Sequence, residues 1–128
     1  MTLHATFAIK GSPLDPAPST EHIGAGRMRF DKVFQGDLAG TSVVEMIGWM
    51  DKQSASGGYV AMERFTGSVA GRSGSFVLQH ASTMDRGTPA QQITVVPGSG
   101  TGELQGLRGS MTIDVVEKQH RCTFVCTW

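Results

Sequence analysis

Alternation of apolar and polar residues dominates the chain, and this period of two predicts β-strands rather than helices. The pattern appears over residues 3–9 and returns in further segments that are separated by glycine-rich or proline-rich breaks. The eight segments that show it cover residues 3–9, 27–36, 41–50, 57–71, 72–84, 91–96, 109–118 and 121–128. Many short strands with closely spaced turns predict an all-β sandwich or barrel, and eight strands suffice to close a barrel around side chains or one small ligand.

Two segments complicate this pattern. Residues 11–26 contain Pro13, Pro16 and Pro18, and a long loop is predicted there because proline cannot donate to a sheet ladder. Loops of this length are commonly functional or mobile. Residues 42–53 also fit a helix, since apolar residues recur at i, i+3, i+4 and i+7, but the adjacent valines and an internal glycine favour a strand.

Glycine is concentrated in residues 98–109, which raises the question of a phosphate-binding loop. The dinucleotide motif G-x-G-x-x-G fails because its third glycine falls on Glu103 or Gln105, and no Gly-Lys pair exists for a P-loop. The G-x-S-x-G nucleophile elbow also fails, since serine replaces its second glycine. The glycines are therefore predicted to form turns, bulges and barrel corners, with Leu104 and Leu107 closing a core.

Composition narrows the function classes. The chain has 128 residues, which fits a single domain over residues 1–128. Eleven basic and eleven acidic residues cancel, so there is no electrostatic footprint for nucleic acid or an anionic membrane. No apolar run spans a bilayer and the N-terminus lacks a signal-peptide pattern, so we expect a cytoplasmic protein.

The cysteines give no sign of a disulfide or a metal site. Cys122 and Cys126 would lie on one face of a strand, roughly 13 Å apart, which is too far for a bond between them. Reduced, buried thiols are expected. Their spacing matches no zinc signature, and we predict neither a metal nor a cofactor.

Glu63 is the most informative polar residue, because its predicted strand face carries Tyr59, Ala61 and Phe65. Burying a carboxylate is costly unless it is paired, and burial raises its pKa toward values that suit a general acid or base. The structural alternative is an ion pair with Arg64, Arg72 or Lys32 from a neighbouring strand. The sequence leaves both interpretations open.

Other side chains of the predicted strands could accompany Glu63 in a lumen. Glu45 shares a face with Val43, Ile47 and Trp49, and His80 shares one with Phe76 and Leu78. Each of these polar residues also has a structural interpretation, as a paired or rim side chain. The residues expected to bind a ligand are Tyr59, Arg64, Phe65, Gln79, His80, Glu45 and Trp49.

Two long stretches resemble a known family. "ERFTGSVAGRSGSFVLQH" at 63–80 and "VVPGSGTGELQGLRG" at 95–109 are similar to the bacterial DUF3224 family, and "FQGDLAGTSVVEMI" at 34–47 resembles its early strand pair. The resemblance implies a single antiparallel eight-stranded β-barrel similar to the allene oxide cyclase barrel. The first loop departs from the family pattern, since it lacks a tryptophan followed by acidic residues. The family has no assigned function, and a shared fold does not transfer cyclase chemistry.

Three functional hypotheses follow. In the first, the barrel binds a small, largely apolar molecule in its lumen, and Glu63 acts as acid or base of an isomerase or cyclase with Tyr59, Arg64 and His80 orienting the substrate. In the second, the barrel is a carrier without chemistry. In the third, it is an interaction module that forms a dimer or trimer through an apolar strand face. The faces considered for that contact are Val44, Met46 and Met50, or Val60 and Met62.

Overall fold

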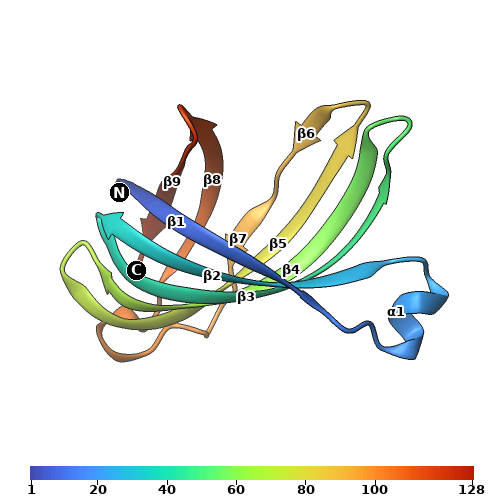
Figure 1. Ribbon diagram of the computed structural model, residues 1–128. Helices are drawn as coiled ribbons and strands as arrows, with labels where there is room; N and C mark the ends of the chain where they lie inside the picture. The colour runs from blue at the N-terminus through green and yellow to red at the C-terminus, as the bar shows by residue number, and fades with distance from the viewer.

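The alternating segments form antiparallel strands that wrap around one interior, as the computed structural model of residues 1–128 shows (Figure 1). The strands are β1 (Thr2–Leu14), β2 (Gly26–Gly36), β3 (Leu38–Asp51), β4 (Ser56–Val69), β5 (Arg72–Asp85), β6 (Thr88–Ala90), β7 (Ile93–Val95), β8 (Arg108–Val116) and β9 (Gln119–Thr127). Two short helices accompany them, α1 (Pro18–His22) and the 3-10 helix η1 (Gly102–Leu104).

Eight of these strands close a barrel. Their order is β4-β3-β2-β1-β9-β8-β7-β5, and β5 pairs with β4 to complete the circle. The ninth strand, β6, pairs only with β5. The predicted eight-stranded antiparallel barrel is confirmed, whereas the likeness to the allene oxide cyclase barrel stays an expectation from the sequence resemblance.

The barrel closes more firmly at one end than at the other. Strands β3, β4 and β5 pair along nearly their whole lengths. In contrast, β7 meets β8 through two residue pairs only, and the pairing of β1 with β9 ends at Phe7 although β1 follows β2 as far as Leu14. The far ends of β8 and β9 therefore lie apart from β5 and β6 (Figure 1).

The firmly closed end contains the apolar core. Five phenylalanines form a continuous series across it, with ring centroids 5.0–5.7 Å apart from Phe7 through Phe34, Phe65 and Phe76 to Phe124. Rings at these separations attract one another beyond simple burial. These five rings fill much of the packed half of the interior.

The glycine-rich segment seals this end, as predicted. Leu104 and Leu107 are fully buried in the core. A Cβ at Gly74 would overlap the carbonyl of Thr101, and one at Gly100 would overlap the carbonyl of Leu104. These glycines are required because two backbone segments touch, not because a phosphate is bound.

The proline-rich segment differs from the prediction. Strand β1 continues to Leu14, so the connection to β2 covers only residues 15–25. Pro13 pairs with Met28 where β9 no longer flanks β1, and one edge of the strand is therefore free of ladder partners. The connection also contains the helix α1, which the sequence pattern does not predict and which has a proline in its first turn.

Other local predictions have mixed outcomes. Residues 42–53 form strand β3 followed by a turn rather than a helix, as favoured. The short strand β6 was missed because its three residues include a proline. Both cysteines are free and buried, and burial raises the pKa of the Cys122 thiol to about 11. No helix has the length and apolar character needed to cross a membrane.

Candidate functional site

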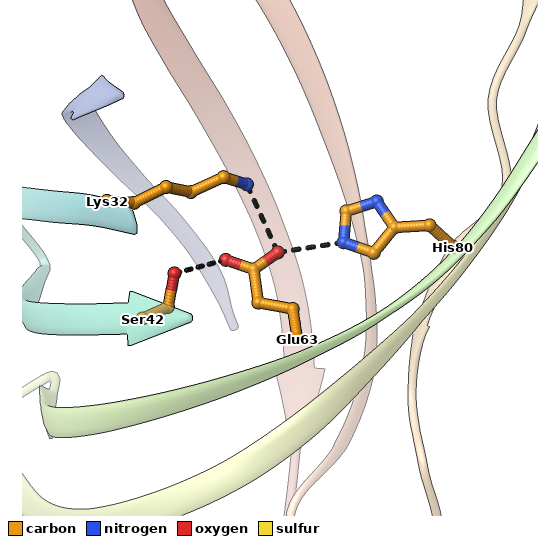
Figure 2. A network of polar contacts seen from close by, with 4 residues as sticks. All are labelled: Lys32, Ser42, Glu63 and His80. Atoms are coloured by element: carbon orange, nitrogen blue, oxygen red, sulfur yellow. Dashed lines mark hydrogen bonds and ion pairs between the residues drawn. The ribbon is translucent and has the colours of Figure 1, made fainter. Parts of the chain in front are cut away.

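Glu63 lies at the centre of a buried polar cluster. Its Oε1 accepts hydrogen bonds from Lys32 Nζ at 3.1 Å and from His80 Nε2 at 2.8 Å, and its Oε2 accepts one from Ser42 Oγ at 2.5 Å (Figure 2). The four side chains come from four neighbouring strands, β2, β3, β4 and β5. We call these four residues the ion cluster. Of the alternatives left open by the sequence, the structure has the ion pair with Lys32.

The surroundings of Glu63 keep its carboxylate charged. Burial raises its pKa, but the hydrogen bond from His80, the charge of Lys32 and the hydrogen bond from Ser42 together hold the pKa below the ordinary value of 4.5. An ionised carboxylate only accepts hydrogen bonds, so Nε2 of His80 carries a hydrogen. Nδ1 of His80 has no hydrogen-bond partner in the protein.

Lys32 is stabilised by aromatic rings as well as by Glu63. Its Nζ lies 4.6 Å from the ring centroid of Phe7 and 5.9 Å from that of Phe34. A cation above a ring face is attracted by the ring quadrupole, more so where water is excluded. The ion cluster is thus in direct contact with the aromatic core and borders it on the side that faces the rest of the interior.

On the side of the ion cluster that faces away from the aromatic core, the interior opens into a cavity of about 440 Å³, which we call the chamber. This volume lies within the range of small-molecule pockets, about 300–1,000 Å³. The side chains that give it its apolar character are Met28, Met46, Met50, Met84, Trp49 and Tyr59. The chamber lies at the end of the barrel that carries α1 and the β3–β4 hairpin (Figure 1).

Glycines at inward-facing positions create this hollow. Gly26 and Gly48 are paired across β2 and β3, and Gly48 is paired in turn with Tyr59, which is paired with Ser82. A Cβ at Gly26 would meet nothing within 4 Å, and one at Gly48 would meet nothing closer than 3.4 Å. Side chains usually fill the interior of an eight-stranded barrel, but these two glycines leave part of it empty.

The chamber has few polar groups. Ser82 Oγ is buried and has no hydrogen-bond partner. Arg27 is the one charged residue in the lining, and its guanidinium is already bonded to the Asp15 carbonyl at 2.7 Å and to a carboxylate oxygen of Glu45 at 3.0 Å. The chamber accordingly offers hydroxyl groups and no uncompensated charge.

The ion cluster and the chamber are neighbours on the same strands. One row of inward-facing residues across β2 to β5 consists of Met28, Met46, Ala61 and His80. The next row contains Ser82 and lies closer to the end of the barrel that holds the chamber, which we call the mouth. Two of these four, the methionines, line the chamber, but none of the ion-cluster residues does. The cluster therefore lies beneath the chamber rather than in its wall.

The structure separates the predicted site residues into two groups. Tyr59, Glu63, Phe65 and His80 face the interior, but Phe65 is part of the aromatic core and only Tyr59 lines the chamber. Trp49 is 52% exposed and contributes to the chamber at its rim.

Three of the predicted residues lie outside the lumen. Glu45, Arg64 and Gln79 are exposed on the outer surface, because each is offset by one residue from the inward-facing positions of its strand. A ligand in the lumen would not contact them. Conversely, Ser82 and the chamber methionines were not predicted as site residues, and the signal that could have revealed them is the presence of glycine inside strands.

No set of three or more His, Cys, Asp and Glu side chains lies in an arrangement that could hold a metal ion. The buried polar and charged residues are Thr20, Lys32, Ser42, Glu63, His80 and Ser82.

An antiparallel barrel with an ion cluster in its core and an apolar chamber at one mouth is the class of protein that these features define. The chain matches the family described as "Protein of unknown function (DUF3224)" over residues 3–125, and it belongs to that family. It is similar to the crystal structure of a protein of unknown function from the same family, from Shewanella oneidensis MR-1. The two share 39% sequence identity with a TM-score of 0.91, covering 100% of this chain and 97% of the other. No curated protein matches the chain.

Proposed function

We propose that the barrel binds a small, largely apolar molecule in the chamber. The observation that supports this most is the cavity of about 440 Å³ lined by four methionines, in a barrel whose other half is firmly packed. Methionine is flexible and polarizable, and it suits surfaces that adapt to apolar ligands. A hollow formed by inward-facing glycines is a site that the chain leaves free for something other than its own side chains.

Binding without catalysis by Glu63 fits the geometry best. Both carboxylate oxygens are occupied by hydrogen bonds, and the lowered pKa keeps the group from donating a proton near neutral pH. The alternative, in which Glu63 is the acid or base of an isomerase, requires the carboxylate to leave its partners and reach the chamber. His80, with an unpartnered Nδ1, is closer to the chamber in strand register.

The chamber is tested with a probe and one blocking substitution. Gly48→Leu places a side chain in the hollow, where the first added atom meets only ordinary contacts. We expect binding of the fluorescent probe N-phenylnaphthylamine to fall at least about tenfold, because the leucine occupies the probe's volume. Thr41→Leu is the control, since it adds apolar bulk to the outer face of the same strand.

Fluorescence of Trp49 gives a second measurement of the same event. The chain has two tryptophans, and Trp49 lies at the chamber whereas Trp128 stacks on Arg72. In a Trp128→Phe background, the probe should quench Trp49, and Gly48→Leu should abolish that quenching. Equal binding of the probe to the wild type and to Gly48→Leu would reject the chamber as a site.

Self-association is a second candidate, favoured by apolar side chains on the outside of the barrel. Val43, Val60 and Met62 are 44%, 56% and 49% exposed on neighbouring strands. Exposed apolar patches on a sheet commonly mark protein contacts, and the proposed occupant is a second copy of the chain. Of the faces considered, Val44 and Met46 point inward, so Val60 and Met62 remain.

The oligomer is tested by mass in solution. Light scattering should give a multiple of 13.6 kDa for the wild type and a smaller species for Met62→Glu. Thr66→Glu, an exposed substitution farther along the same strand face, is the control. A wild-type mass equal to one chain at every concentration would reject this candidate.

A further inference from the structure

We infer that the chamber is built for a neutral molecule that carries a hydrogen-bonding oxygen, such as an alcohol or a ketone, with the oxygen held between Ser82 and Tyr59. The inference rests on the proposed function and names the chemistry of the ligand.

Ser82 supplies the first observation. Its residue is 7% exposed, its Oγ has no hydrogen-bond partner, and it lines the chamber. Nearly all buried polar groups are paired, because leaving one without a partner is destabilising. The Oγ itself is covered by protein atoms, and rotation about χ1 would turn this unpartnered hydroxyl toward an oxygen that a ligand supplies.

Tyr59 supplies the second observation. It is paired directly with Ser82 across β4 and β5, and both residues face the interior. No hydrogen bond within the protein involves the Tyr59 hydroxyl. Residues directly opposite each other on antiparallel strands have Cβ atoms about 4.5–5.5 Å apart. The two side chains thus start from adjacent positions on one wall, and each carries a hydroxyl group.

The charges around the chamber decide between a neutral and an ionic ligand. Arg27 at the rim is neutralised by Glu45, and Lys32 beneath the chamber is neutralised by Glu63. A carboxylate or ammonium group would be desolvated without a counter-ion, which is costly. Desolvating a hydroxyl or carbonyl oxygen costs much less, and serine and tyrosine hydroxyls can donate to either oxygen and accept from a hydroxyl.

The remaining wall matches the rest of such a molecule. Met28 and Met46 lie in the row beneath Ser82, and Met50 and Met84 lie in the row nearest the mouth. The row of Tyr59 and Ser82 is thus flanked by methionines on both sides along the strands. The apolar body of the ligand would contact sulfur and methyl groups while its oxygen points toward β4 and β5.

Four probes with the same eight-carbon chain test the inference: octane, octanol, octanone and octanoate. Each is titrated against the complex of the protein with N-phenylnaphthylamine, and displacement of the dye gives its affinity. The affinities of octane, octanol and octanone are each divided by the probe's own partition from water into a hydrocarbon solvent, because octanol and octanone give up hydrogen bonds with water that octane does not make. On that scale we expect octanol and octanone to bind about tenfold more tightly than octane, since satisfying a buried hydroxyl is worth about 1.4 kcal/mol. Octanoate, compared by direct affinity, should bind more weakly than octanol or octanone.

Substitutions then assign the preference to the hydroxyl pair. Ser82→Ala and Tyr59→Phe each remove an oxygen and little volume, so octane should bind them as it binds the wild type, whereas the advantage of octanol should shrink to about threefold or less. Ser56→Ala, a serine outside the chamber lining on the same strand as Tyr59, is the control and should keep the full advantage.

The outcomes separate this inference from the proposed function. Equal partition-corrected affinity for octane and octanol, tighter binding of octanoate than of octanol, or an unchanged preference in Ser82→Ala and Tyr59→Phe overturns the inference while the chamber remains a site. Displacement by none of the four probes, together with dye binding that Gly48→Leu does not alter, overturns both.

Discussion

The two ends of this barrel use the same strands for opposite purposes. At the closed end, the inward positions of β3, β4 and β5 hold large, fully buried side chains such as Leu38, Phe65 and Phe76. At the mouth, inward positions on these strands hold Gly48, Tyr59 and Ser82, and the interior is hollow. The comparison teaches that continuous strand pairing lets one half carry the stability while the other half of the same strands stays hollow.

The largest expected difference between the two ends is in the cost of removing a side chain. Phe76→Ala should lower the free energy of unfolding by about 3–5 kcal/mol, because it removes a fully buried ring and leaves a cavity. Met46→Ala should cost about 1 kcal/mol, since it only enlarges a hollow that already exists. Urea denaturation of both variants measures the difference. Equal losses would show that the mouth is packed as firmly as the closed end.

The ion cluster forms the boundary between the two ends, and breaking it should be nearly as costly. Glu63→Gln leaves the buried charge of Lys32 without a counter-charge, which typically destabilises by about 3–5 kcal/mol. Adding Lys32→Met to Glu63→Gln removes that charge, and the glutamine can still bond His80 and Ser42. The double variant should therefore be more stable than the single one.

Glu45→Gln is the matched control for this prediction. It removes the carboxylate of the ion pair with Arg27, which is exposed on the outer surface, and pairs of this kind contribute at most about 1 kcal/mol. A double variant no more stable than Glu63→Gln alone would mean that the charge of Lys32 is not the cause.

Acid should act on the ion cluster before it acts on the aromatic core. The pKa of Glu63 is lower in the folded protein than its ordinary value of 4.5, so the unfolded chain binds the proton more readily. The stabilisation is complete above that ordinary value and is lost as the pH falls through the lowered pKa. Thermal unfolding measured at decreasing pH should therefore show a steeper loss for the wild type than for the double variant Lys32→Met/Glu63→Gln. Parallel curves would contradict the assignment.

How far the sequence predicted this architecture depended on the strand. Residues 57–71 place Ala61, Glu63 and Phe65 on one face, and this face lies inward in β4, but the alternation alone left open which of the two faces is inside. Strand β3 is apolar on both faces, with Val43 and Val44 adjacent, and alternation could not show that Glu45 points outward.

Partners and helices were harder to foresee. The choice of Lys32 over two arginines as the partner of Glu63 depends on the register of three strands, which involves contacts between residues far apart in the chain. Helix α1 has five residues, too few to leave a helical period. The chamber depends on Gly26 and Gly48, whose meaning emerges only when their inward direction is known.

The smallest expected effect distinguishes the glycines of the two ends. Gly48→Ala adds a Cβ that meets only ordinary contacts, at a backbone conformation open to any residue. It should raise the free energy of unfolding by about 0.4–1 kcal/mol, because alanine has less freedom to lose from the unfolded chain. Gly74→Ala, on the next strand but one, should instead destabilise by more than that, since its Cβ would overlap the Thr101 carbonyl. Thermal unfolding of the two variants gives both signs. A loss of stability in Gly48→Ala would mean that glycine at the mouth serves the backbone, as it does at the closed end, and not the space for a ligand.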